Sequence, residues 1–192
     1  MSVVLLSVLA LVACTQAQVP SFGACPDLPV KTNFNAKKYT GIWYEYERYF
    51  AIFELFGTCT YANYTLKPNG RIDVVNTGVN RFTGNANRVH GEAYAPDASE
   101  PAKLLVSFDQ SPAKPGPYWV LDTDYRNYSI VYSCVDLVDT SWIKAKAEIV
   151  WILARSRAGP SASLVQKAEG KLKNLGVSTI PLLKTRQTNC SN

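Results

Sequence analysis

Residues that commonly carry catalysis are scarce in this chain of 192 residues. His90 is the only histidine, and there is no G-x-S-x-G, P-loop, G-x-G-x-x-G or H-E-x-x-H motif. Alternation along its predicted strand places His90 with Arg88 and Glu92 on the outer face, where a histidine is usually a surface residue rather than a base or a haem ligand. The sequence therefore predicts a protein that is not an enzyme and holds no metal or cofactor.

Long apolar runs and long basic runs are also few. The one extended apolar run, Val3 to Ala13, is about half as long as a membrane-spanning helix and lies at the extreme N-terminus. It predicts a signal peptide over residues 1–17, cleaved before Gln18, and one domain over 18–192. A lipoprotein box ending at Cys14 is the alternative interpretation. Because the lysine clusters are short, the net charge of +5 does not indicate a nucleic-acid partner.

Cysteine and glycosylation patterns both indicate secretion. Removal of the signal peptide leaves four cysteines without a C-x-x-C pair, which predicts two disulfides in an oxidising compartment; they are Cys25, Cys59, Cys134 and Cys190. Three pairings are open on this evidence. N-x-[ST] acceptors occur at Asn63 and Asn127, and a third at Asn189 competes with disulfide formation at the next residue. We therefore expect an extracellular glycoprotein.

The body of the chain alternates between short β-rich runs and turn signals. Leu104, Val106 and Phe108 alternate with polar neighbours, which predicts strands with one apolar face. Eight such runs lie near 41–49, 58–66, 71–79, 88–95, 103–108, 118–124, 128–135 and 148–155. After Gly159 and Pro160 the apolar period becomes helical, from Leu164 to Leu175. The pattern predicts an all-β fold, an eight-stranded antiparallel barrel with one C-terminal helix packed outside.

Three short motifs, in order, resemble the signature of one family. They are Gly41-Ile42-Trp43, Thr123-Asp124-Tyr125 and Arg155 at the end of the last strand. Together they are similar to those of the lipocalins, a group of calycin folds. Ala62 to Thr65, Pro117 to Trp119 and Val131 to Cys134 further resemble apolipoprotein D-like lipocalins and the related invertebrate bilin- and carotenoid-binding lipocalins. The resemblance extends from Cys25 to Cys190.

The resemblance implies an up-and-down barrel, open at one end, that transports a small hydrophobic ligand such as a lipid, fatty acid, retinoid, sterol, bilin or carotenoid. It assigns a structural role to Gly41, Trp43, Thr123, Asp124 and Arg155. Trp43 would close one end, with the guanidinium of Arg155 over its ring. The implied disulfides are Cys25–Cys134 and Cys59–Cys190. Two alternatives are a pigment-binding structural subunit of an oligomeric carotenoid or bilin protein and, less favoured, a lipocalin-fold enzyme.

Candidate ligand-binding residues follow from the same resemblance. Tyr64, Tyr118, Tyr125 and Trp151 match aromatic cavity positions of the apolipoprotein D-like group, and such rings also occur as ordinary core. Glu45 shares the strand parity of Trp43, so its carboxylate would point inward unless a bulge turned it out. These five residues form the predicted site.

The connection from Tyr49 to Phe56 has almost no polar residue. In the family this connection lies across the barrel mouth, so one interpretation is a lid over the cavity. The other is an exposed patch that contacts a lipid surface, a lipoprotein particle or a second subunit. Its apolar residues are Phe50, Ile52, Phe53, Leu55 and Phe56.

Overall fold

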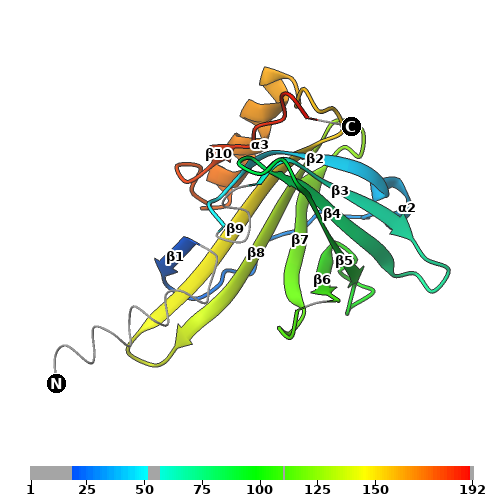
Figure 1. The fold of residues 1–192 in the computed structure, drawn as a ribbon. Coiled ribbons are helices and arrows are strands. Elements are labelled where there is room, and N and C mark those ends of the chain that lie inside the picture. The colour runs from blue at the N-terminus through cyan, green and yellow to red at the C-terminus, as the bar shows by residue number, and fades with distance from the viewer. Residues whose placement is uncertain (1–18, 52–56, 110, 191–192) are drawn as a thin grey trace.

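Eight consecutive antiparallel strands close into a barrel in the computed structural model, which describes residues 19–51, 57–109 and 111–190 (Figure 1). Each strand pairs with the next along the chain, and β9 returns to pair with β2, so the predicted fold is confirmed. The strands are β2 (Gly41–Arg48), β3 (Gly57–Leu66), β4 (Ile72–Asn80), β5 (Ala86–Tyr94), β6 (Lys103–Phe108), β7 (Gly116–Thr123), β8 (Tyr128–Asp139) and β9 (Lys144–Ala154).

Three short elements supplement the predicted ones. β1 (Val19–Phe22) pairs with β9, the helix α2 (Ala36–Tyr39) precedes β2, and β10 (Leu183–Lys184) pairs with β2. Pro20 lies within β1. Proline fits there because β1 is at the end of the strand order, where a missing amide donor is tolerated.

The C-terminal segment becomes part of the barrel wall. The pairing of β2 with β3 extends only to Tyr44. Beyond that point, the backbone amide of Thr185 donates to the Tyr46 carbonyl at 2.9 Å, and the Arg186 carbonyl accepts from the Cys59 amide at 2.8 Å. The Gln187 side chain donates to carbonyls on both strands. Backbone groups that the divergence of β2 and β3 would leave unpaired are thus satisfied.

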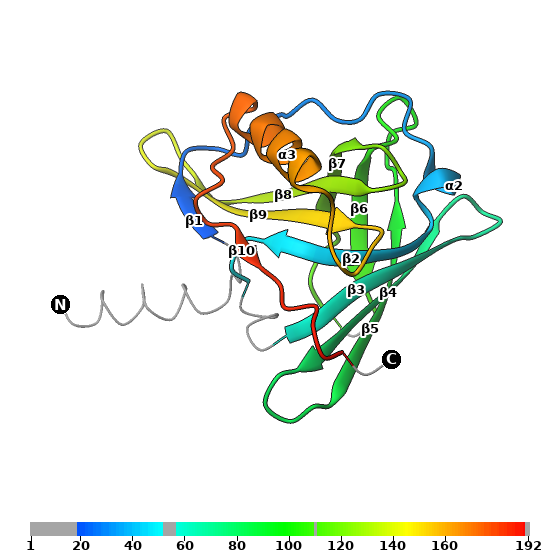
Figure 2. The same ribbon diagram turned by 90° about the horizontal axis from the view of Figure 1, so that it is seen from above.

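The predicted C-terminal helix is α3 (Ala162–Asn174). The Ser161 hydroxyl accepts from the Leu164 amide and caps the first turn. Gly176, with φ of +74°, ends the helix, and the amide of Val177 returns to the Leu172 carbonyl at 3.0 Å, as in a Schellman motif. Ala168 and Leu172 are fully buried against the outer face of the barrel, where α3 lies across the sheet (Figure 2).

The β8–β9 hairpin is longer than the alternation of its residues predicts. It projects beyond the neighbouring strands (Figure 1). Both of its faces are therefore exposed to solvent near the tip, where charged residues such as Asp139 and Lys144 interrupt the apolar alternation. A bulge between Asp136 and Val138 shifts the register there. Neither α2 nor α3, the helices of the described residues, has the length and apolarity needed to cross a bilayer.

Candidate ligand-binding site

One end of the barrel is closed by an aromatic plug. The Trp43 ring is completely buried, and its indole nitrogen donates to the Tyr39 carbonyl at 2.9 Å. The guanidinium carbon of Arg155 lies 3.8 Å from the ring centroid. Gly41 has φ of +91°, and a Cβ there would lie 3.3 Å from Arg155, so a larger residue would meet both backbone strain and the guanidinium. The predicted structural roles of these residues fit this geometry.

Thr123 and Asp124 organise the turn between β7 and β8. The Thr123 hydroxyl donates to the Tyr128 carbonyl at 2.7 Å and accepts from the Tyr125 amide. The Asp124 carboxylate accepts from the backbone amides of Arg126, Asn127 and Tyr128. Both side chains therefore fix the backbone of this turn, and neither of them lines the cavity inside the barrel.

Inside the barrel, next to this plug, lies a cavity of about 40 Å³. Its wall is apolar except for three phenols and one amide, and none of its lining side chains carries a charge. The lining residues are Tyr39, Tyr64, Ile72, Val74, Asn76, Ala93, Leu104, Val106, Phe108 and Tyr118. The arrangement suits an apolar molecule with a single neutral polar group.

The three phenols of the cavity share one chain of hydroxyl groups. The oxygens of Tyr64 and Tyr118 are 2.9 Å apart, those of Tyr118 and Tyr39 are 3.1 Å apart, and the Tyr39 oxygen is 2.9 Å from the Ser129 hydroxyl. The rings of Tyr39 and Tyr64 are stacked, with centroids 5.7 Å apart. Burial raises the pKa of Tyr39 to about 12 and raises the pKa values of Tyr64 and Tyr118 as well, so all three are neutral hydrogen-bonding groups at physiological pH.

The four aromatic residues of the predicted site do not all line the cavity. Tyr64 and Tyr118 line the cavity. The hydroxyl of Tyr125 instead accepts from the Asn35 amide at 3.0 Å, and its ring packs near Phe34 beside the plug. Its backbone has a positive φ in the β7–β8 turn, which places the ring away from the lining set.

Trp151 and Glu45 also lie outside the lining set. Trp151 is half-buried on β9 opposite Arg48. Glu45 lies opposite Leu153 of the interior cluster, and the bulge that could turn it outward comes after it. Its buried carboxylate is 3.0 Å from the Arg48 guanidinium and accepts from the Thr185 hydroxyl. Glu45 therefore joins β2 to the C-terminal segment within the barrel wall.

Tyr39 and Asn76 were not predicted as site residues. Tyr39 belongs to the short helix α2, which no strand pattern reveals. The sequence feature that could have identified Tyr39 is its position four residues before Trp43, because the Tyr39 carbonyl accepts a hydrogen bond from the Trp43 indole. Asn76 could have been found from parity, since it follows Ile72 and Val74 at a spacing of two on the inner face of β4.

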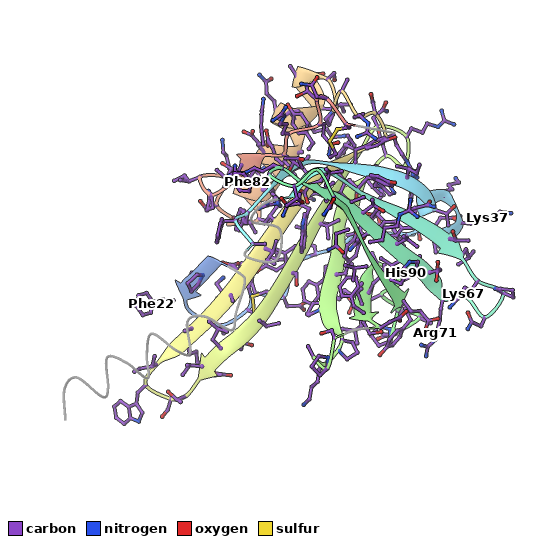
Figure 3. All side chains as sticks on the ribbon, viewed as in Figure 1. Phe22, Lys37, Lys67, Arg71, Phe82 and His90 are labelled. Atoms are coloured by element: carbon purple, nitrogen blue, oxygen red, sulfur yellow. A yellow bond between two sulfur atoms is a disulfide. The ribbon has the colours of Figure 1, made fainter. Side chains whose placement is uncertain are left out.

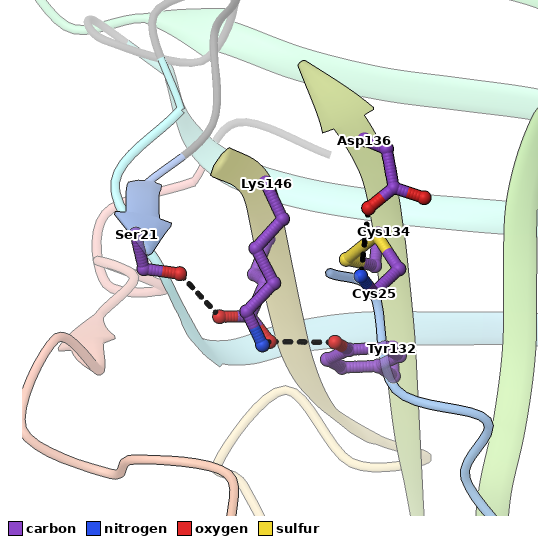
Figure 4. The surroundings of a disulfide bond; sticks show 7 residues. Ser21, Cys25, Tyr132, Cys134, Asp136 and Lys146 are labelled. Carbon is purple, nitrogen blue, oxygen red and sulfur yellow. Dashed lines mark hydrogen bonds and ion pairs between the residues drawn. A yellow bond between two sulfur atoms is a disulfide. The ribbon is translucent and has the colours of Figure 1, made fainter. Parts of the chain in front are cut away.

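Both implied disulfides are confirmed. Cys25 and Cys134 join the N-terminal segment to β8, and Cys59 and Cys190 join β3 to the C-terminal segment. Around the first, the Cys25 amide donates to the Asp136 carboxylate at 2.7 Å (Figure 4). A hollow of about 310 Å³ lies outside the barrel beside this bond, lined by Cys25, Pro26, Asp27, Trp119, Tyr132 and Cys134. Unlike the barrel cavity, it includes a carboxylate.

Other predicted positions lie at the surface or outside the described residues. His90 is exposed, on the outer side of β5 (Figure 3). Asn63 and Asn127 are exposed as well. Of the five apolar residues predicted as a lid or contact patch, only Phe50 is described, and it is 43% exposed. Ile52, Phe53, Leu55 and Phe56 lie outside the described residues, as does the predicted signal peptide, 1–17. Within 19–51, 57–109 and 111–190 no three His, Cys, Asp or Glu residues gather to hold a metal ion.

Comparisons with known proteins agree with this architecture. Residues 34–187 match the family model described as a lipocalin-like domain. The chain is 41% identical to apolipoprotein D of Cavia porcellus, with 99% of this chain and 97% of that one covered. It is 35% identical to the bilin-binding protein of Pieris brassicae, covering 79% and 78%. Insecticyanin of Manduca sexta has a similar structure, with a TM-score of 0.78, 25% identity and coverage of 91% and 93%.

Proposed function

The chain belongs to the lipocalin family, and we propose that it binds a small hydrophobic molecule in the barrel cavity and carries it reversibly, without chemical conversion. The observation that carries the proposal is the uncharged barrel cavity with apolar walls and a cluster of phenols beside the plug. Such a site gains free energy by removing apolar ligand surface from water and orients the ligand with few polar groups.

The size of the cavity favours a slender ligand. Ligand pockets in proteins typically measure about 300–1,000 Å³, whereas this cavity is about 40 Å³. A single alkyl or isoprenoid chain requires the least displacement of the wall. The names of the bilin-binding relative and of insecticyanin support a second candidate, a pigment, for which the interior rings would have to move apart.

Three measurements test this proposal. Solvent extraction of the natural protein followed by mass spectrometry identifies the bound molecule, and visible absorbance separates a pigment from a colourless lipid. In recombinant protein, Val106→Phe fills the cavity from inside β6, while Leu105→Phe is the matched control because Leu105 does not line the cavity. We expect calorimetric binding of methyl nonyl ketone to be lost in the first variant alone. Equal binding by both variants would contradict a site in this cavity.

We also propose that the protein is secreted and glycosylated. Two disulfides in the described chain support an oxidising compartment, and the apolar N-terminal run supports a cleaved signal peptide. The N-terminal sequence of protein recovered from a eukaryotic culture medium tests this directly. A start at Gln18 is the expected result, and retention of residues 1–17 would contradict the assignment.

A weak contact with lipid surfaces is a second candidate function. Three exposed side chains support it at the projecting β8–β9 hairpin and the adjoining β1: Trp142 is 92%, Phe22 is 91% and Ile143 is 59% exposed. Figure 3 labels Phe22. Phe22 pairs opposite Ala145, next to the hairpin tip. Tryptophan at a convex tip fits the interface of a bilayer, where its ring is apolar and its N–H remains hydrated.

Vesicle co-sedimentation distinguishes a contact through the hairpin from nonspecific adsorption to lipid. Trp142→Ser should lower partitioning onto phosphatidylcholine vesicles, and Ile180→Ser is the matched control, because Ile180 is equally exposed, at 92%, on a different segment. Equal partitioning of both variants with wild type would remove the hairpin from the contact. Sedimentation of wild type as a dimer without lipid binding would assign the surface to a second copy instead.

A further inference from the structure

The chain of hydroxyl groups beside the plug has one more hydroxyl proton than it has internal hydrogen bonds. It runs through four hydroxyls, in the order Ser129, Tyr39, Tyr118, Tyr64, and is joined by three hydrogen bonds. Each bond uses one proton, so one hydroxyl must donate outside the chain. Which end releases that donor determines what the cavity offers a ligand.

The two ends of the chain have different surroundings. Ser129 is completely buried, and within the described residues its hydroxyl has one hydrogen-bond partner, Tyr39. Tyr64, at the other end, lines the cavity. A buried donor without an acceptor is costly, whereas a donor facing the cavity can reach a ligand or water. With each inner hydroxyl accepting one bond and donating one, the favourable direction therefore has Ser129 donating to Tyr39, Tyr39 to Tyr118, Tyr118 to Tyr64, and Tyr64 to the cavity.

We propose that this directed hydroxyl chain selects an apolar ligand whose leading end is a neutral carbonyl, which accepts from Tyr64. An alcohol can also accept this bond, but with the chain in this direction the Tyr64 oxygen already accepts from Tyr118, so the alcohol's own proton meets only an oxygen whose hydrogen bond is already made. Reversing the chain to accept that proton would leave the Ser129 hydroxyl without an acceptor. A carboxylate accepts too, yet the lining residues include no cation to compensate for the removal of its charge from water.

Tyr118 is the positioning residue in this arrangement. It contacts both neighbours in the chain, and its ring is edge-on to that of Tyr64, with centroids 6.2 Å apart. Tyr118→Phe keeps the ring and removes the donor that fixes the direction of the Tyr64 hydroxyl. Tyr64 is then able either to donate or to accept, so an alcohol and a ketone become more nearly equal ligands.

The test uses three probes with the same carbon count: methyl nonyl ketone, methyl nonyl carbinol and undecanoate. Because ketones and alcohols differ in their cost of dehydration, the diagnostic quantity is the change in the ketone-to-alcohol affinity ratio between variants, measured by calorimetry. We expect Tyr118→Phe to lower this ratio about three- to tenfold, the effect of one hydrogen bond. Undecanoate should bind wild type more weakly than the ketone.

Two controls keep the result interpretable. Tyr44→Phe removes a phenol outside the cavity lining and should leave the ratio unchanged. Tyr64→Phe should weaken the ketone, with thermal unfolding showing that each variant is folded. An unchanged ratio in folded Tyr118→Phe, or undecanoate binding as tightly as the ketone, would overturn the inference while the proposed carrier function stands. Absence of binding by all three probes to wild type would overturn both, since the inference rests on the proposed function.

Discussion

The guanidinium of Arg155 covers the indole of Trp43 at 3.8 Å and at the same time ties backbone carbonyls of three separate segments together. Its nitrogens donate to Tyr125 at 3.0 Å, Ile42 at 2.8 Å and Lys38 at 3.1 Å. These carbonyls belong to the β7–β8 turn, to β2 and to α2. One side chain therefore joins the last barrel strand to the segments that form the closed end, which no lysine could do with the same geometry.

We predict that Arg155→Lys destabilises the protein by about 2–3 kcal/mol, because it loses the stacked ring contact and at least two of the four hydrogen bonds to backbone carbonyls. Chemical denaturation measures the change. Arg157→Lys is the matched control, since Arg157 also lies over an aromatic ring, that of Tyr44, at 4.7 Å, but on the outside of the barrel. A similar loss in both variants would contradict the special role of Arg155.

The buried phenols should make the fold sensitive to alkali. The pKa of Tyr39 is raised from 10.0 in its ordinary state to about 12 by burial. Because the folded pKa lies above the unfolded value, this contribution to the free energy of unfolding is complete below pH 10 and is lost as the pH rises towards 12. We expect the melting temperature to fall in this window as tyrosinate absorbance appears. Ionisation of all the tyrosines near pH 10 without unfolding would contradict it.

We predict that the ionised Glu47 carboxylate destabilises the folded protein at neutral pH. Its side-chain oxygen Oε2 is buried and has no hydrogen-bond partner among the described residues, and burial, followed by the nearby charge of Glu169, raises the pKa of this carboxyl. A raised folded pKa means that the favourable contribution exists at low pH and is lost as the pH increases. Glu47→Gln should therefore stabilise the protein at pH 7, by about 1 kcal/mol.

The gain from Glu47→Gln should shrink as the pH is lowered and the wild-type carboxyl becomes protonated. Denaturation curves for both proteins at several pH values measure this dependence. Glu100→Gln, in an exposed turn, should show no such gain. A Glu47→Gln variant that is less stable than wild type at pH 7, or a difference independent of pH, would disprove the prediction.

Glycan occupancy should be higher at Asn63 than at Asn127. Asn63 is exposed on β3, opposite residue Ile42 of the outer face. The side-chain amide of Asn127, in contrast, donates to the Asp124 carboxylate at 2.7 Å in the turn that also holds Tyr125. In protein from a eukaryotic host, Asn63→Gln should produce the larger mobility shift. An unmodified peptide containing Asn63 would contradict the expectation.

Local sequence determined most of the scaffold. Alternation at a period of two marked the barrel strands, because each strand has one face on an apolar interior and one in water. A period near 3.6 after Gly159 and Pro160 marked α3, and the structure has Ser161 and Gly176 at its ends. Alternation also placed Val106 and Phe108 inside, where they line the cavity.

Only the tertiary structure decided which aromatic residues meet. Tyr64 and Tyr118 join Tyr39 and Ser129 in one hydroxyl chain, whereas the equally aromatic Tyr125 bonds to Asn35 instead. The insertion of the C-terminal segment beside β2 is likewise invisible in the short, mixed residues around Leu183. These features depend on register, bulges and turns that bring distant residues within hydrogen-bonding range. A local pattern records which face a side chain occupies, but not the partner it finds there.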